Sequence, residues 1–137
     1  MDALGIALFV AIGICLVWAT IHDRVRNRRV SRLLESRPQR DDVTFAQAFF
    51  PASSTEGTMA VRLRAILEDN LDQSMKGLDP DDRLDEDLNA ELLTNPHLFW
   101  ALEEEFGIKT SVMTYAEHES DLGSVKTVGD LLSFVER

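Results

Sequence analysis

The densest group of side chains that could do chemistry is a run of six carboxylates between residues 79 and 87. They are Asp79, Asp81, Asp82, Asp85, Glu86 and Asp87. Carboxylates at this density suggest calcium, but a helix–loop–helix calcium site needs glycine at its sixth position and glutamate at its twelfth. Counting from Asp81, these positions hold Glu86 and Leu92. The sequence therefore predicts a solvated acidic loop and no metal site.

The histidine, cysteine and hydroxyl side chains form no recognisable catalytic group. His22, His97 and His118 are far apart and lack the helical spacing of a ligand pair. Cys15 is the only cysteine, so no disulfide framework is possible within the chain. The sequence contains no phosphate-cradling glycine loop and no nucleophile motif. We therefore expect no catalytic residue, no cofactor and no enzymatic activity.

Charge is divided unevenly along the chain. Residues 1–40 hold seven arginines against three acidic residues, a net of +4. Residues 41–137 hold seven basic residues against 21 acidic ones, a net of −14. An acidic domain repels nucleic acid and attracts basic surfaces. We therefore expect a basic protein partner and no nucleic acid.

The element that precedes these groups is a run of 19 residues without a charge, from Ala3 to Ile21. At ~1.5 Å per residue a helix of this length spans roughly 28 Å, close to the hydrocarbon core of a bilayer. The arginines follow the run, whereas a signal peptide carries its basic residues before it. This order predicts an uncleaved single-pass anchor over residues 1–22, at the cell membrane, with the C-terminal domain cytoplasmic.

Residues 23–52 are expected to form a basic juxtamembrane segment and linker. Its arginine collar suits anionic lipid headgroups, or serves only to set the topology. The collar consists of Arg24, Arg26, Arg28, Arg29, Arg32, Arg37 and Arg40. Phe45 and Phe49 would share a helix face, with Phe50 beside them. The sequence leaves open whether that face packs on the domain, lies on the membrane or fills a groove.

Small residues also recur at every fourth position of the anchor. They are Ala3, Ala7, Ala11, Cys15 and Ala19. Such a ridge lets two helices approach closely in lipid, although alanine is simply common in membrane helices. Both interpretations remain open.

Residues 53–137 predict an all-α domain without a strand pattern. Apolar residues recur at helical spacing from about 56 to 75, and Gly77 and Asp79-Pro80 end that helix. Asn95-Pro96 suits the start of a second helix and Gly107 its end. We expect an extended run within residues 108–116 and a turn of helix around residues 117–122. A last helix opens at Thr127.

These helices, with three short motifs in register, resemble acyl carrier proteins over roughly residues 56–136. The motifs are LDEDL at residues 84–88, ALEEEF at 101–106 and TVGDL at 127–131. The resemblance implies a four-helix bundle after the transmembrane helix. It also implies that the second bundle helix and the loop before it meet protein partners. The implied partner-binding residues are Asp85, Asp87, Glu91, Glu103 and Glu104.

The resemblance also implies an attachment site, and that site is altered here. In the family, a serine between aspartate and leucine carries the 4′-phosphopantetheine arm. Its position corresponds to Leu92, the family aspartate to Glu91 and the family glycine to Asn89. An alkyl side chain cannot form a phosphodiester, and Pro96 falls inside the helix that normally begins at the serine. The resemblance therefore implies a degenerate member that lacks the arm.

Three functions are compatible with these observations. The first is a non-catalytic interaction module that is anchored at the cytoplasmic membrane face by residues 3–21 and the arginine collar. The second is a working acyl carrier with a displaced attachment residue, for which Thr94, Ser111 and Ser124 are the available hydroxyls. The third is non-covalent binding of an acyl chain between the helices.

Overall fold

The described part of the chain is helical throughout. The computed structural model describes residues 3–50, 54–90, 95–107 and 123–135. Its five helices are α1 (Ala3–Glu35), α2 (Asp42–Phe49), α3 (Ser54–Leu71), α4 (Pro96–Phe106) and α7 (Val128–Val135). Within these residues the one strand-like feature is an isolated antiparallel bridge between Arg83 and Thr127. The expected all-α class is confirmed.

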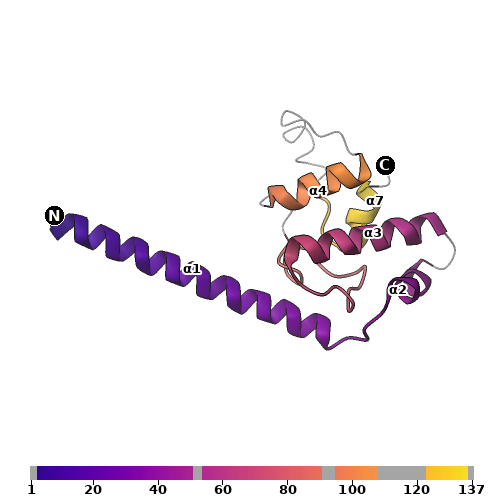
Figure 1. Ribbon diagram of the computed structural model, residues 1–137, viewed down its shortest axis with the longest axis horizontal. Coiled ribbons are helices and arrows are strands. Elements are labelled where there is room, and N and C mark those ends of the chain that lie inside the picture. Colours follow the sequence, from indigo (N-terminus) through magenta and orange to yellow (C-terminus); the bar gives the residue numbers. More distant parts are fainter. Residues whose placement is uncertain (1–2, 51–53, 91–94, 108–122, 136–137) are drawn as a thin grey trace.

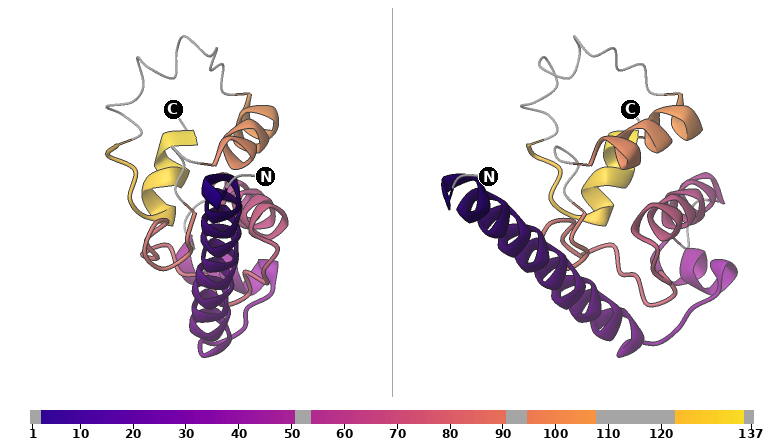
Figure 2. Two further views of the ribbon diagram at one scale, coloured as in Figure 1. Left: turned by 90° about the vertical axis from the view of Figure 1, so that its left-hand side faces the viewer. Right: turned by 60° about the vertical axis from the view of Figure 1, so that its left-hand side comes forward.

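The longest element, α1, is a single helix of 33 residues that projects from the domain (Figure 1). None of its apolar N-terminal window is buried, and the right-hand view of Figure 2 shows the same projection. By length and composition it is the one helix in the described residues that is able to cross a membrane. The chain leaves it at Glu35, shortly before Pro38, a residue that interrupts helices.

The C-terminal end of α1 belongs to the domain rather than to the projecting arm. Val30 and Leu34 are buried in the same hydrophobic core as the domain helices. Polar contacts reinforce this packing, since Ser31 donates to Gln73 Oε1 at 3.1 Å and Gln73 donates to Asn27 O at 3.2 Å. Helix α1 is therefore continuous with one wall of the domain.

Helix α2 packs on the domain, which selects one of the three alternatives for this segment. Asp41 caps the helix by accepting a hydrogen bond from the N–H of Thr44 at 2.7 Å. Phe45 is buried, and the rings of Phe49 and Phe50 meet it edge to face, with centroids 5.4 Å and 6.4 Å away. This aromatic cluster covers part of α3.

Helix α3 ends four residues before the expected boundary at residue 75. Asp72 has a left-handed backbone, with φ 50°, which breaks the helix after Leu71. The Glu68 carboxylate then accepts a hydrogen bond from the N–H of Met75 at 2.9 Å, and this bond stabilises the turn. Met75 is still fully buried, so its apolar signal came from the core and not from the helix.

Both ends of α4 lie where the sequence predicts them. Asn95 is the N-cap, and its side chain accepts a hydrogen bond from the N–H of Leu98 at 3.1 Å. Pro96 occupies the first turn, where its missing N–H costs nothing. Gly107 ends the helix in the left-handed conformation, with φ 65°.

Helix α7 begins with a reciprocal cap. Thr127 N–H donates to Asp130 Oδ2 at 3.0 Å, and Asp130 N–H donates back to Thr127 Oγ1 at 3.1 Å. The N–H of Lys126 also donates to Asp130 Oδ2, at 3.1 Å. These backbone donors lower the pKa of Asp130, those of Thr127 and Lys126 being the largest causes. The predicted start at Thr127 is therefore its N-cap.

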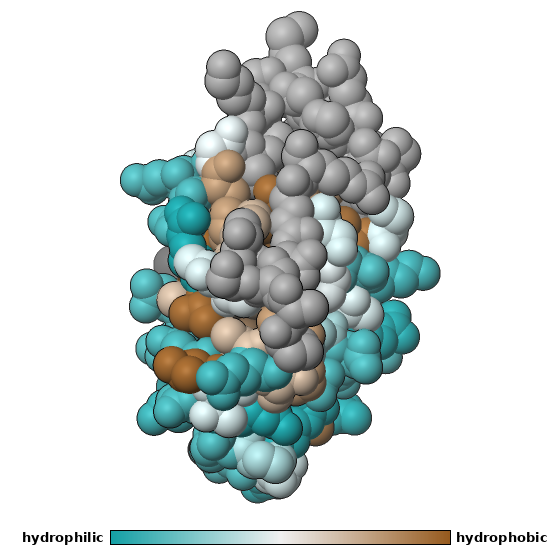
Figure 3. All heavy atoms as spheres, turned by 90° about the vertical axis from the view of Figure 1, so that its right-hand side faces the viewer, coloured by the Kyte–Doolittle hydropathy of each residue, from teal (hydrophilic) through white to brown (hydrophobic). Residues whose placement is uncertain are grey.

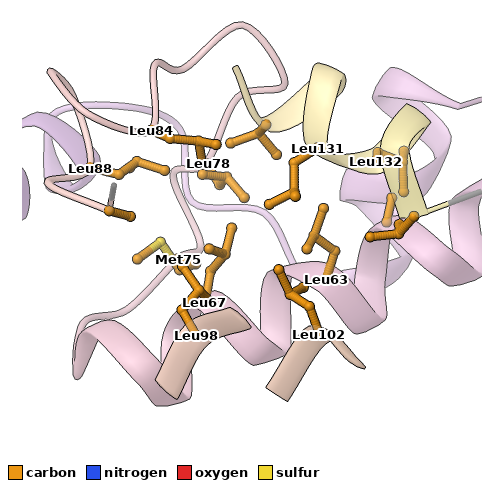
Figure 4. Close-up of a cluster of buried hydrophobic side chains, with 14 of the residues drawn as sticks. Leu63, Leu67, Met75, Leu78, Leu84, Leu88, Leu98, Leu102, Leu131 and Leu132 are labelled. Atoms are coloured by element: carbon orange, nitrogen blue, oxygen red, sulfur yellow. The ribbon is translucent and has the colours of Figure 1, made fainter. Parts of the chain in front are cut away.

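A leucine-rich core joins α3, α4 and α7 to the loop that follows α3. Figure 4 shows the leucines of the three helices converging on the loop residues. The helices contribute Leu63, Leu67, Leu98, Leu102, Leu131 and Leu132, and the loop contributes Met75, Leu78, Leu84 and Leu88. The acidic loop is thus anchored by apolar side chains, which fixes the course of its carboxylates.

Candidate interaction site on α4 and the acidic loop

The acidic loop uses several of its carboxylates to hold its own shape. Asp82 is only 2% exposed and accepts hydrogen bonds from Arg37 Nη1 at 2.5 Å and 2.7 Å. It also accepts one from the N–H of Asp79, at 2.9 Å. The bond to Asp82 raises the pKa of the Arg37 guanidinium. The expectation of a fully solvated loop is therefore wrong at Asp82.

Two predicted partner residues of this loop, Asp85 and Asp87, are partly engaged within it. Asp87 accepts a hydrogen bond from the N–H of Arg83 at 2.9 Å. Arg83 approaches Asp85 at 3.6 Å and pairs with Glu86 at 2.9 Å, on an exposed surface. Exposed pairs of this kind exchange readily with a partner's charges, because each is worth only ~0–1 kcal/mol. Asp85 is exposed, whereas the carboxylate of Asp87 helps to hold the loop.

The three glutamates near the end of α4 have three different environments. Glu105 pairs with Arg62 Nε at 2.6 Å and lends its backbone carbonyl to Arg62 Nη2 at 2.9 Å. Glu103 is half-buried, and its enclosed Oε1 accepts no hydrogen bond. Glu104 is exposed and pairs with no described residue. Of the predicted pair Glu103 and Glu104, the second therefore presents the more accessible charge.

An exposed tryptophan beside these glutamates is a site residue that the charge pattern did not reveal. Trp100 is 59% exposed, although α4 buries Leu98, Phe99 and Leu102. The ring of His97 meets it edge on, with centroids 5.6 Å apart. At 100° per residue, His97, Trp100 and Glu104 share the face opposite the core. The apolar spacing of α4 would have placed Trp100 on this outer face.

The predicted partner residues come from two elements. Asp85 and Asp87 lie in the loop that follows α3, and Glu103 and Glu104 lie on α4. The described ranges contain no group of three or more potential metal ligands. Glu91 and Leu92 lie outside the described residues. The described part of the predicted site therefore consists of loop residues and α4 residues.

The chain around the position of Leu92 is well defined on both sides. Asn89 has a left-handed backbone with φ 54°, and Ala90 is fully buried. On the other side, Asn95 caps α4 and Pro96 begins it. Helix α4 therefore starts four residues after position 92 and not at it.

Apart from α1, the face of the domain seen in Figure 3 offers little apolar area. Figure 3 views the side of the molecule away from the N-terminus, where apolar residues form small separate patches among hydrophilic ones. A pocket of about 400 Å³ lies between α2, the acidic loop and α7. Its lining mixes Phe50, Pro80 and Leu132 with the polar groups of Asp81, Thr127 and Ser133. That mixed lining does not suit an alkyl chain, which needs an apolar enclosure.

Comparison with known proteins gives one consistent group of relatives. An acyl carrier protein of Solidesulfovibrio magneticus is 30% identical over 80 residues, which are 58% of this chain and 94% of that protein. One of Thermosynechococcus vestitus is 34% identical over 74 residues, 54% of this chain and 83% of its own length. One of Borreliella burgdorferi is 32% identical over 76 residues, or 56% and 86%. No family model and no solved structure matches the chain.

Proposed function

This chain belongs to the acyl carrier protein family, and from that premise we propose that it is a non-catalytic interaction module held at the cytoplasmic membrane face. Its relatives carry the name of carriers and not of enzymes, which is consistent with a chain that does no chemistry itself. The proposed partner is a basic protein.

One observation carries the proposal: Leu92 stands where the family resemblance places the attachment serine. Attachment of a phosphopantetheine arm requires an oxygen nucleophile that attacks phosphorus. An isobutyl side chain has no such atom and no proton to transfer. A carrier domain that keeps its helices without this oxygen is left with its protein-binding surfaces.

The start of α4 supports the same conclusion. A modifying transferase would meet the serine at the beginning of a helix, whereas here the cap of Asn95 and the ring of Pro96 place the first turn later. Moving the helix start back would require an unfavourable proline inside the helix, at a cost of ~3 kcal/mol. Both the nucleophile and its helical setting are therefore unsuited to modification.

The membrane part of the proposal is supported by α1. Its apolar N-terminal half is unburied, which is costly in water and favourable in lipid. The arginines lie immediately after it, on the part of the helix nearest the domain. By the positive-inside rule this order places the domain in the cytoplasm.

Mass spectrometry of the intact protein tests the loss of the attachment site. The purified chain is incubated with coenzyme A and a phosphopantetheinyl transferase of broad specificity, with a conventional acyl carrier protein as positive control. We expect the control to gain the arm and this chain to keep its mass. The double variant Leu92→Ser, Pro96→Val restores the hydroxyl and removes the ring, and we expect it to be modified.

Modification of the wild-type chain on any residue would refute the proposal and favour a working carrier. The acceptor peptide would then show whether Thr94, Ser111 or Ser124 holds the arm. Membrane attachment is tested separately, because alkaline extraction leaves integral proteins in the membrane pellet. Recovery of the full chain in the supernatant would refute the membrane anchor. It would not affect the test of whether the chain carries a phosphopantetheine arm.

A further inference from the structure

We propose that copies of this chain associate head to tail in the membrane, with α4 of one copy docked on the arginine-bearing part of α1 in the next. This inference rests on the proposed membrane anchoring by α1. It concerns a surface made of His97, Trp100 and Glu104, called the α4 ridge, and a second surface made of Arg28, Arg29 and Arg32, called the outer arginine face.

The outer arginine face is free within its own copy. Val30 and Leu34 are buried against the domain, and at 100° per residue Arg28, Arg29 and Arg32 lie around the opposite side of α1. All three are exposed, and none pairs with a carboxylate among the described residues. By contrast, Arg37, Arg62, Arg64 and Arg83 each pair with an acidic residue. The outer face therefore carries three charges without a described counter-ion.

The α4 ridge has the complementary chemistry. Trp100 presents an aromatic ring, which attracts a guanidinium placed over its face. Glu104 is one helical turn further along the same face and is exposed. Half-buried Glu103 lies at the edge of the ridge with an oxygen that accepts no hydrogen bond. An arginine that stacks on Trp100 is thus within reach of a carboxylate.

The shape of the molecule makes a second copy the fitting occupant. Measured along the axis of α1, α4 lies level with the C-terminal half of that helix, with α3 between the two (Figure 1). In a neighbouring copy that spans the same membrane, the arginines of α1 lie at the same depth below the bilayer. Since Val30 and Leu34 fix the domain to α1, that depth is the same in every copy.

Confinement to one membrane strengthens a contact that would be weak alone. The outer arginine face points away from the domain and the α4 ridge points away from the core, so the two surfaces lie on opposite sides of one copy and join copies head to tail. Confinement to the bilayer raises the effective concentration of neighbouring copies and holds them in one orientation. The segregation of charge, +4 over residues 1–40 and −14 over residues 41–137, favours this head-to-arm arrangement.

Energy transfer between labelled copies of the full chain tests the proposal. Donor and acceptor copies, labelled at the C-terminus, are mixed in phosphatidylcholine vesicles and diluted with lipid to give an association constant. We expect Trp100→Ala and Glu104→Arg each to weaken association about tenfold, as is usual for a central aromatic or charged contact. Val43→Ala is the matched control, because Val43 is an exposed apolar residue on α2, and it should change nothing.

Charge-reversal variants give the decisive test. The variant Arg29→Glu, Arg32→Glu should dissociate like Glu104→Arg, and the combination of all three changes should restore association. Transfer that ignores these variants but disappears with Ala11→Ile would overturn the proposal in favour of packing along the small-residue ridge of α1. Transfer that disappears when phosphatidylglycerol is added would assign the arginines to lipid headgroups instead, and no transfer at all would also overturn it. Alkaline extraction of the same vesicles reports insertion, so a failed anchor is distinguished from a failed contact.

Discussion

Asp82 differs most from its neighbours among the carboxylates of the acidic loop. It is buried, and it accepts hydrogen bonds from the side chain of Arg37 and the backbone of Asp79. Arg37 comes from the segment after α1, 45 residues earlier in the chain. A single carboxylate therefore joins the loop to the segment that leads back to α1.

Loss of Arg37 should destabilise the protein more than loss of an exposed arginine. Arg37→Met leaves Asp82 buried without its cation, which costs up to ~3–5 kcal/mol for a fully buried pair. Because the Arg37 side chain is 30% exposed, we expect about 2 kcal/mol, read from urea denaturation. Arg83→Met is the control: its pairs with Asp85 and Glu86 are exposed, so the change should stay below ~1 kcal/mol. Equal losses for the two variants would contradict a special role for Asp82.

Asp130 should make the stability of the protein depend on pH in the acid range. Its pKa is lowered in the folded state by backbone donors, so the folded protein binds this proton less readily than the unfolded chain does. The contribution is therefore complete above the unfolded pKa of ~3.9 and is lost as pH falls through the lower folded pKa. Asp130→Asn should flatten this part of the curve of unfolding free energy against pH. If the curves of the two proteins run parallel, Asp130 does not contribute to the loss of stability at acid pH.

At the scale of elements, the contact between α1 and the loop after α3 is unusually close. A Cβ added at Gly77 would lie 2.0 Å from Leu34 O and 2.9 Å from its carbonyl carbon. Both are backbone atoms, so no side chain is able to move aside. Only glycine permits this approach, which places the end of α1 directly against the domain.

The substitution Gly77→Ala should therefore separate α1 from the domain. We expect a fall in the free energy of unfolding of about 2 kcal/mol or more, as for an overpacked core, measured by thermal denaturation. Gly13→Ala is the matched control, since nothing lies within 4 Å of a Cβ at that position. If the Gly77→Ala variant is as stable as this control, α1 and the loop are able to move apart for the added methyl group without loss of stability.

Element ends were predictable from the sequence wherever a local cap decided them. Asn95, Pro96 and Gly107 define α4 through their own backbone preferences, and Thr127 does the same for α7 with Asp130. The end of α3 was not predictable in this way. It depends on a left-handed aspartate and on the bond from the Met75 N–H to the Glu68 side chain. Both features form only in the folded chain. The apolar spacing, which continues up to Met75, predicts a longer helix instead.

The candidate site was only partly predictable for a similar reason. The charges of Asp85 and Glu104 identify them as exposed groups, but nothing in the acidic run distinguishes Asp82, whose partner Arg37 comes from the other side of the molecule. Val30 and Leu34 were also inconspicuous, because arginines surround them in the sequence. Tertiary packing, rather than local pattern, gave these residues their roles.

For the whole molecule, the hydrophobic core begins well before residue 53. Val30, Leu34 and Phe45 share one core with the leucines of α3, α4 and α7. Arg64 reinforces this arrangement, since it donates to the carbonyl of Arg40 at 3.0 Å, pairs with Asp42 and lies over the ring of Phe45. The segment between α1 and α3 therefore acts as a structural part of the domain.

A comparison of two soluble fragments tests whether that segment contributes to stability. The fragment 24–137 keeps Val30, Leu34 and Phe45, whereas 53–137 exposes the surfaces that these side chains cover. Burial of each is worth ~1.5–3 kcal/mol, so the shorter fragment should lose roughly 5 kcal/mol, comparable with the whole stability of many small domains. Circular dichroism should show a cooperative melt for 24–137 and a low or absent transition for 53–137. The fragment 24–137 with Leu34→Ala should melt between them, because it removes one of the three contacts. If 53–137 melts at the same temperature as 24–137, the segment only rests on a domain that is complete without it.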